Sequence, residues 1–244
     1  MLIDTHTHLH FRNFNRDRDA VIERAKATLE AVFEAGVDAN TNEKVLSLAS
    51  KHPNFIYPAI GLHPTENVAL DECAKVEAQI KENASRIIAV GEIGLDYHHK
   101  TPPDMQRIVF DRMLSLAESL SLPVVVHSRD AEQDCLNALS SYKLPEVIMH
   151  CFSSKSLLST CLERGYLVSI PTTVCFSKDA KAIAKATPLS SMLLETDCPF
   201  LSPLKGKRNE PSFLSYSVST LSKLLNKTPE EISSATAANA RKLL

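Results

Sequence analysis

Six side chains of metal-binding type follow short apolar runs in this chain. Imidazoles and carboxylates are the ligands that divalent metals of hard to borderline character prefer in proteins. If the six converge in space, they form a site for one or two metal ions, and the chain is a metal-dependent hydrolase. The six are His6, His8, Glu92, His127, His150 and Asp197.

The first two candidates lie two residues apart in the run DTHTH. A β-strand puts His6 and His8 on the same face, roughly 6–7 Å apart along the strand, where both can bind one ion. An isolated H-x-H pair is more often a chance pattern than a metal site. His10 continues the spacing but lies past the expected end of the strand. The interpretation of His6 and His8 as metal ligands therefore depends on the other four candidates.

Those four close four separate apolar runs, RIIAVGE, PVVVH, EVIMH and MLLETD. Any one of them alone is more often a polar residue satisfied by a neighbour. Burying all four side chains without partners would cost free energy. Packing alone does not explain why a polar residue of this kind stands at the C-terminal end of several strands. We expect the two N-terminal histidines to bind one metal and His127 with His150 to bind the other. Glu92 has two oxygens and is expected to bridge them.

Glu92 and Asp197 are the candidate catalytic carboxylates. Asp197 is expected to bind metal and also to orient or deprotonate the attacking water. A bound divalent ion lowers the pKa of water and stabilises charge that develops in the transition state. Two ions would suit a phosphodiester, because both the attacking and the leaving oxygen need stabilising.

Eight β-like runs alternate with amphipathic segments along the chain. Residues 130–142, 154–164 and 178–187 are three of the amphipathic segments and are expected to be helices. Several runs are apolar throughout, as in parallel strands that are covered on both faces. Their number predicts a (β/α)₈ TIM barrel formed by a single domain, residues 1–244, with the six candidates on one rim. An open doubly wound sheet is the alternative, but the first strand is followed by no Gly-rich loop. The runs are 2–6, 31–36, 55–62, 86–93, 123–128, 146–151, 166–170 and 192–197.

Two segments carry the start signal of a helix, a threonine followed by proline and an acidic residue. Thr101 is expected to cap a helix that opens with Pro102, with Asp104 at the capping-box spacing. Thr228, followed by Pro229, predicts the same arrangement near the C-terminus.

Composition excludes several classes of protein. The net charge is −2 over 244 residues, so the chain as a whole has no basic field that would hold nucleic acid. No apolar run approaches the roughly 20 residues of a membrane span. Because MLIDTHTHLHF has no basic segment followed by a long apolar one, we expect no signal peptide. The six cysteines include no C-x-x-C pair and are expected to be free thiols. We expect a cytoplasmic protein, with a monomer favoured.

At these residues the chain resembles a known family. The blocks DTHTHLHF, GLHP, GEIGLDY, LPVVVHSRDA, HCFSS and LLETDCPFLSP are similar, in this order, to those of the TatD metal-dependent deoxyribonucleases. That family belongs to the amidohydrolase-like TIM barrels. The resemblance spans nearly the whole chain and implies the same six metal ligands. It also implies dependence on Mg²⁺, Mn²⁺ or Zn²⁺ and hydrolysis of nucleic-acid phosphodiesters, commonly from the 3′ end.

The chain departs from the family pattern at Ser154 and Pro171, where the family usually has Gly. Both lie beside the expected rim, so the differences bear on the choice of substrate. Three further residues are expected to bind substrate. His63 in GLHP belongs on the rim but is also a plausible turn residue, and Arg129 suits phosphate but also a salt bridge. Asn209 matches a family block and follows a basic loop, residues 205–208.

Nucleic acid, as DNA ends or RNA, is therefore the expected partner, and no membrane is. Two alternatives remain open. The same metals could serve an ester or amide hydrolase, for example an aminoacyl-tRNA deacylase, because function depends on loops rather than on the fold. A non-catalytic protein with a structural metal is less well supported, because structural sites are often rich in Cys and have four ligands.

Overall fold

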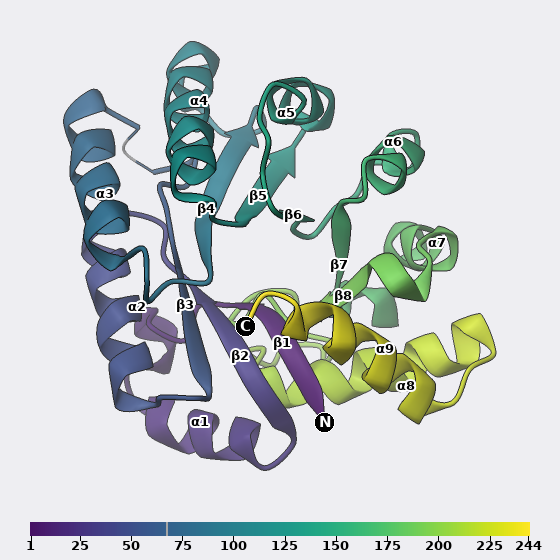
Figure 1. The fold of residues 1–244 in the computed structure, drawn as a ribbon. Helices are drawn as coiled ribbons and strands as arrows, with labels where there is room; N and C mark the ends of the chain where they lie inside the picture. Colours follow the sequence, from purple (N-terminus) through teal and green to yellow (C-terminus); the bar gives the residue numbers. More distant parts are fainter. Residues whose placement is uncertain (67) are drawn as a thin grey trace.

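The computed structural model describes residues 1–66 and 68–244, and its strands form one parallel sheet. The strands follow one another around the sheet in sequence order, from β1 to β8, with helices on the outside (Figure 1). This arrangement confirms the predicted (β/α)₈ TIM barrel. The strands are β1 Leu2–Thr7, β2 Leu29–Ala35, β3 Ile56–Ile60, β4 Ala89–Asp96, β5 Val124–Arg129, β6 Val147–Met149, β7 Leu167–Pro171 and β8 Met192–Glu195.

The helices occupy the segments between the strands and the C-terminus. The α-helices are α1 Arg18–Lys26, α2 Ala39–Lys51, α3 Leu70–Asn83, α4 Pro103–Leu120, α5 Glu132–Leu139, α6 Leu158–Glu163, α7 Lys178–Ala186, α8 Leu214–Leu225 and α9 Pro229–Arg241. Short 3₁₀ helices are η1 Arg12–Phe14, η2 Thr172–Cys175, η3 Leu189–Ser191 and η4 Pro211–Phe213.

The barrel closes where the segment after β8 meets β1. Thr7 and Cys198 form a parallel bridge, and the Cys198 carbonyl accepts a hydrogen bond of 2.9 Å from the backbone N–H of His8. The backbone N–H of Asp197 donates to the His6 carbonyl at 3.0 Å. Candidate ligands on opposite ends of the sequence are thus hydrogen-bonded neighbours.

Period-two alternation along the strands separates an outer and an inner core. Outward side chains such as Val32 and Val124 pack under the helices. Inward side chains such as Phe33 and Val125 fill the barrel interior together with Ala237 and other residues of α9. Because α9 packs on residues near the starts of the strands, it closes the N-terminal end of the barrel. The opposite rim is left open for a site.

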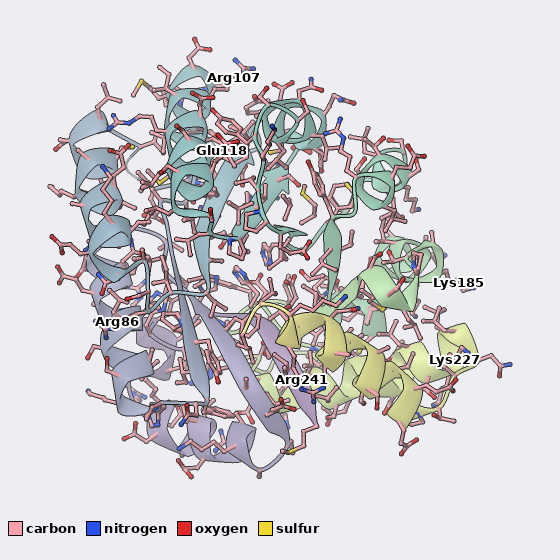
Figure 2. The ribbon with its side chains drawn as sticks, in the orientation of Figure 1. Arg86, Arg107, Glu118, Lys185, Lys227 and Arg241 are labelled. Atoms are coloured by element: carbon pink, nitrogen blue, oxygen red, sulfur yellow. The ribbon has the colours of Figure 1, made fainter. Side chains whose placement is uncertain are left out.

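An ion pair anchors this closing helix. Arg241, at the end of α9 (Figure 2), donates from Nε to Glu30 Oε1 at 2.7 Å, which ties the helix to β2. Both side chains are partly exposed, so we assign the pair a modest contribution to stability.

Three predicted strands are shorter than expected. β3 ends at Ile60, β6 at Met149 and β8 at Glu195, rather than at residues 62, 151 and 197. His150 and Asp197 therefore follow their strands instead of closing them, and Glu92 lies within β4. The apolar runs continued past the sheet because the chain stays buried while it turns into the rim.

The start predicted for the helix after residue 101 is also wrong. α4 begins at Pro103, and its N-cap, Pro102, has no side chain that can accept a hydrogen bond. A residue before proline is held extended, so Pro102 (ψ 125°) cannot be the first helical residue. Thr101 Oγ1 lies 3.0 Å from His99 Nδ1 instead. By contrast, the capping box between Thr228 and Glu231 at the start of α9 is confirmed.

Two expectations about the chain as a whole can be compared with the structure. Within residues 1–66 and 68–244, no helix combines the length and the apolarity that crossing a membrane would require. All six cysteines are free, as predicted.

The two threonines provide a matched pair of substitutions. Thr228→Ala removes the side chain that accepts the Glu231 N–H and should lower the free energy of unfolding by about 1 kcal/mol. Thr101→Ala removes no cap and should change it by less than about 0.5 kcal/mol. Urea denaturation followed by circular dichroism measures both. Equal losses for the two variants would contradict the helix starts described here.

Candidate metal centre

Histidines from β1 and its following loop form one half of a polar cluster on the open rim. His6 Nε2 and His8 Nε2 lie 3.1 Å apart. Glu92 Oε2 lies 3.2 Å from His6 Nε2 and 3.7 Å from His8 Nε2. Asp197 Oδ1 completes this half, 3.4 Å from His8 Nε2. Two imidazole nitrogens and two carboxylate oxygens therefore converge from β1, β4 and the segment after β8.

The other oxygen of Glu92 faces a second group of histidines. Oε1 lies 3.0 Å from His127 Nδ1, 3.2 Å from His63 Nε2 and 3.7 Å from His150 Nε2. The ring of His150 also stacks on His6, with centroids 3.7 Å apart, so the two halves are in contact. The structure thus brings all six predicted residues together and adds His63, which the sequence suggested only as a substrate contact.

Glu92 is the residue that both halves share. Its side chain is 3% exposed, and burial alone would raise the pKa of its carboxyl group. The imidazoles of His63, His6 and His150 outweigh burial and hold the pKa of Glu92 well below its usual range. The carboxylate is therefore ionised and available to bridge two cations.

Buried carboxylates behind the site fix two of the histidine rings. Asp96 Oδ2 lies 2.9 Å from His127 Nε2, and Glu195 Oε2 lies 2.8 Å from His150 Nδ1. Burial would lower the pKa of each histidine, but these acids and Glu92 raise it, to about 9 for His127 and about 10 for His150. Such a carboxylate behind a ligating imidazole sets its orientation and tautomer.

Sequence reasoning missed part of this support. Asp96 also shapes the loop after β4, because its Oδ1 accepts a hydrogen bond of 2.9 Å from the backbone N–H of His99. Glu195 was not singled out from the sequence. The signal was present in the run ETD, because a charged residue inside an apolar strand needs a buried partner.

A third buried carboxylate holds the loop after β1. Glu34 on β2 accepts hydrogen bonds from Thr7 Oγ1 at 2.6 Å, Leu9 N at 2.9 Å and His10 N at 2.7 Å. Its Oε1 also lies 2.7 Å from His10 Nδ1. Burial would raise the pKa of Glu34, but these donors lower it. The loop that carries His8 is therefore fixed by an ionised side chain on the neighbouring strand.

Asp4 fixes the segment that carries Asp197. Its Oδ2 accepts a hydrogen bond of 2.6 Å from Thr196 Oγ1, and its Oδ1 accepts the Thr196 N–H at 2.9 Å. The next residue, Asp197, has φ of 54°, a left-handed conformation that Asp tolerates better than most residues. Non-glycine residues in this conformation concentrate at functional sites, where their surroundings hold them in place.

An irregularity in β4 turns Glu92 into the barrel. Val90 and Ile93 both belong to the outer core, although an odd spacing should put them on opposite faces. The pairing of β4 with β5 shifts register between these two residues, which directs Glu92 inward. Gly94 permits the close pairing that follows, because a Cβ there would lie 2.0 Å from the His127 carbonyl oxygen.

The cluster opens into a pocket of about 330 Å³ on the rim. Besides the histidines and acids, its lining includes Phe11, Phe200 and Arg129. Phe11 stacks on His8 with ring centroids 4.8 Å apart, and Phe200 is about half exposed. The pocket therefore combines the polar centre with an exposed aromatic ring and a guanidinium group.

The three predicted substrate contacts lie in different places. His63 and Arg129 line the pocket, and Arg129 forms no ion pair with the described residues. Asn209 is fully buried, and its Nδ2 donates to Thr172 Oγ1 at 3.0 Å and to the Thr196 carbonyl at 2.8 Å. It holds the segment after β8 and does not line the pocket.

The basic loop at residues 205–208 is less available than its sequence suggests. Arg208 donates to both carboxylate oxygens of Asp17, at 2.9 and 2.7 Å, and stacks over the ring of Phe14. The charge of Arg208 is therefore neutralised by Asp17, the N-cap residue of α1, and is not available to a ligand.

The donor set fits a divalent metal. His6, His8 and Glu92 lie within 4.8 Å of one another, as do His63, Glu92 and His127. The donors are imidazole nitrogens and carboxylate oxygens, which suit zinc, manganese and related ions. The two sets share Glu92, and its two oxygens point one to each set.

Comparison with known proteins gives a consistent result. A model of the family described as TatD related DNase matches residues 3–244. An uncharacterised metal-dependent hydrolase, YabD of Bacillus subtilis, is 39% identical over 254 residues, which cover 100% of this chain and 98% of YabD. The 3′-5′ ssDNA/RNA exonuclease TatD of Erwinia tasmaniensis is 32% identical, covering 99% of each chain.

A solved structure shows the same architecture. The crystal structure of the TatD homologue YjjV from Escherichia coli superposes with a TM-score of 0.92 at 28% identity, covering 100% of this chain and 97% of YjjV. The family match, the relatives and the rim cluster agree, and the chain belongs to the TatD-related DNase family of metal-dependent hydrolases.

Proposed function

We propose that this chain is a deoxyribonuclease that uses divalent metal to hydrolyse phosphodiester bonds at the 3′ ends of DNA, and of RNA as a second substrate. The observation that carries the proposal is the buried Glu92, with one oxygen facing each group of histidines. Two adjacent cations would let both the attacking and the leaving oxygen of a phosphodiester be stabilised. The activity of the Erwinia tasmaniensis relative supports the choice of substrate.

The roles follow from the geometry. His6, His8 and Asp197 would hold one ion, His127 and His150 the other, and Glu92 would bridge them. Bound Zn²⁺, Mg²⁺ or Mn²⁺, as one or two ions, would supply positive charge for the phosphate oxygens and a more acidic water. His63 Nε2 lies 3.2 Å from Glu92 Oε1, and from there it would bind either the second ion or a phosphate oxygen.

Asp197 is the proposed base. Its side chain is 15% exposed, compared with 3% for Glu92, so it faces the pocket more openly. From this position it would orient the attacking water and accept its proton. His8 lies 3.4 Å from Oδ1 and fixes the carboxylate.

Substrate contacts come from the pocket lining. Arg129 would pair with a phosphate through its guanidinium fork, and the half-exposed Phe200 would stack on a base. Asn209 would act indirectly, through the segment it holds. One accessible ring suits the end of a strand better than a long polymer.

Three broader proposals accompany this one. Residues 1–244 would act as one domain, because all eight strands belong to one sheet. We also propose a cytoplasmic location and a monomer, in keeping with the composition.

Glu92→Gln should abolish both metal binding and hydrolysis. The amide keeps the shape of the side chain but removes the charge that balances the two ions. We expect metal content to fall and kcat/KM on single-stranded DNA to drop at least about 100-fold, since even supporting residues cost 10–100-fold. Glu77→Gln is the matched control, because Glu77 pairs with Arg112 outside the site and should leave both quantities unchanged. An active Glu92→Gln variant would contradict the bridging role.

Asp197→Asn should weaken binding of the ion held with His6 and His8 and remove the proposed base. The amide cannot accept the proton of the attacking water, so kcat should fall about 10²–10⁴-fold. The ion on the His127 side should remain, so metal analysis should still find at least one equivalent. Wild-type kcat with unchanged metal content would rule out Asp197 as the base.

Metal removal tests the substrate class. Chelator-treated protein should lose hydrolysis of labelled single-stranded DNA and regain it with Mg²⁺, Mn²⁺ or Zn²⁺. An ester and an aminoacyl-tRNA, offered in parallel, should be cleaved poorly. Rapid cleavage of either one with intact DNA would favour the ester or amide hydrolase, and no cleavage of any substrate would favour a structural metal.

A further inference from the structure

A second pocket, of about 550 Å³, lies beside the metal centre. One wall runs from the end of β1 to the first residue of α1, with His10, Arg12, Asn15 and Arg18, and the other is α2. Residues of α2 line it from Asn40 at the rim to Lys51 at the far end, a length of about 16 Å at 1.5 Å per residue. The pocket is therefore a groove that runs from the rim down the outside of the barrel.

The lining of this groove is basic. Arg12, Lys44 and Lys51 are exposed and form no ion pair with any described residue, and Glu43 is the one acidic residue in the lining. Arg18 adds a fourth positive charge. Its guanidinium donates to the carbonyls of Leu9 at 2.7 Å and of His10 at 3.1 Å, so no carboxylate neutralises it. This excess of cations contrasts with the net charge of −2 for the whole chain.

The floor of the groove holds an unpartnered polar atom. The His10 side chain is buried, and its Nδ1 lies 2.7 Å from Glu34 Oε1. Its Nε2 is also buried and has no hydrogen-bond partner among the described residues. A buried ring nitrogen without a partner is uncommon, and this one belongs to a residue that lines the pocket.

The groove adjoins the metal centre directly. The rings of His10 and His8 have centroids 5.8 Å apart, and Phe11 contacts both. Glu34 holds the backbone of Leu9 and His10 between the two pockets. A strand whose end occupies the metal centre can therefore pass over Phe11 into the groove without leaving the surface.

We propose that this groove binds the phosphates of the single-stranded nucleic acid upstream of the scissile bond. Lys44, Lys51 and Arg12 would contact the backbone phosphates. The inference rests on the proposed function and adds a length preference to it. Strands long enough to reach the groove would bind more tightly than a single phosphodiester.

Charge substitutions in the groove test this inference. Lys44→Ala and Lys51→Ala should each raise KM for a labelled oligothymidylate roughly three- to tenfold at low salt and leave kcat unchanged, because neither lysine is near the reacting atoms. Glu43→Gln removes the opposing charge and should lower KM. Hydrolysis of bis(p-nitrophenyl) phosphate, which is too short to reach the groove, should be the same in all three variants.

Lys185→Ala is the matched control. Lys185 projects outward from α7, on the opposite side of the barrel from α2 (Figure 2), so its loss lowers the total charge equally. Affinity for the oligothymidylate is measured by fluorescence anisotropy in chelator, where no cleavage occurs. The slope of log affinity against log salt should shrink by about 0.7 for each groove lysine lost and stay unchanged for Lys185→Ala.

The outcomes separate the two proposals. A Lys44→Ala/Lys51→Ala double variant with wild-type affinity and salt slope, or an equal effect of Lys185→Ala, would overturn the groove. A different result would be that inorganic phosphate binds the wild type but not the double variant, while the double variant keeps its affinity for the oligothymidylate. That result would assign the groove to a small phosphorylated molecule and would also overturn the proposal. Wild-type protein that binds the oligothymidylate through these lysines but cleaves no phosphodiester would support the groove and contradict the deoxyribonuclease.

Discussion

The structure depends on one buried carboxylate that must stay charged. Glu92 is nearly inaccessible to water, and an ionised group in such a place is tolerated only when donors surround it. Those donors are imidazoles that come from the ends of four different strands or from the turns after them. Only a closed arrangement of parallel strands brings so many strand ends to one point. The barrel and the polar centre therefore require each other.

Keeping this centre in place takes further buried carboxyl groups and irregular backbone. Asp4, Glu34 and Glu195 are buried, and each holds a segment or ring next to the site. β4 gives up regular pairing at Glu92, and Asp197 adopts a left-handed conformation. These features would weaken an ordinary barrel, but here each one aims a side chain at the same small volume. The rim is thus less regular than the opposite end, where α9 packs on apolar residues.

The sequence predicted the parts of this design that follow from periodicity and residue type. Apolar runs identified all eight strands, and six polar residues at their ends identified the centre. A charged residue inside an apolar strand, such as Glu34 or Glu195, indicates a buried partner, but that partner lies far away along the chain, so the sequence did not identify it. Nor could it predict that His63 approaches Glu92, since that distance depends on how β3 is tilted against β4. The sequence suggested that Asn209 and Arg208 are available to bind substrate. In the structure Asn209 donates a hydrogen bond to the Thr196 carbonyl, and Arg208 donates to Asp17.

The distribution of charge suggests how recognition is divided over the surface. The pocket over the centre is lined by acidic and basic groups in similar number, and the net charge of the chain, −2, adds no attraction for a phosphate. Attraction for a phosphate would come from positive groups around the rim, on α2, in the segment after β1 and at Arg129. The proposed chemistry and part of the proposed affinity for the strand then depend on different elements of the fold. The centre is built from strand ends that the fold holds in place, whereas the groove is built from helix surface that can change without disturbing the barrel. Proteins that share this centre can therefore differ in the length of strand that they bind through changes on α2, without any change in the barrel.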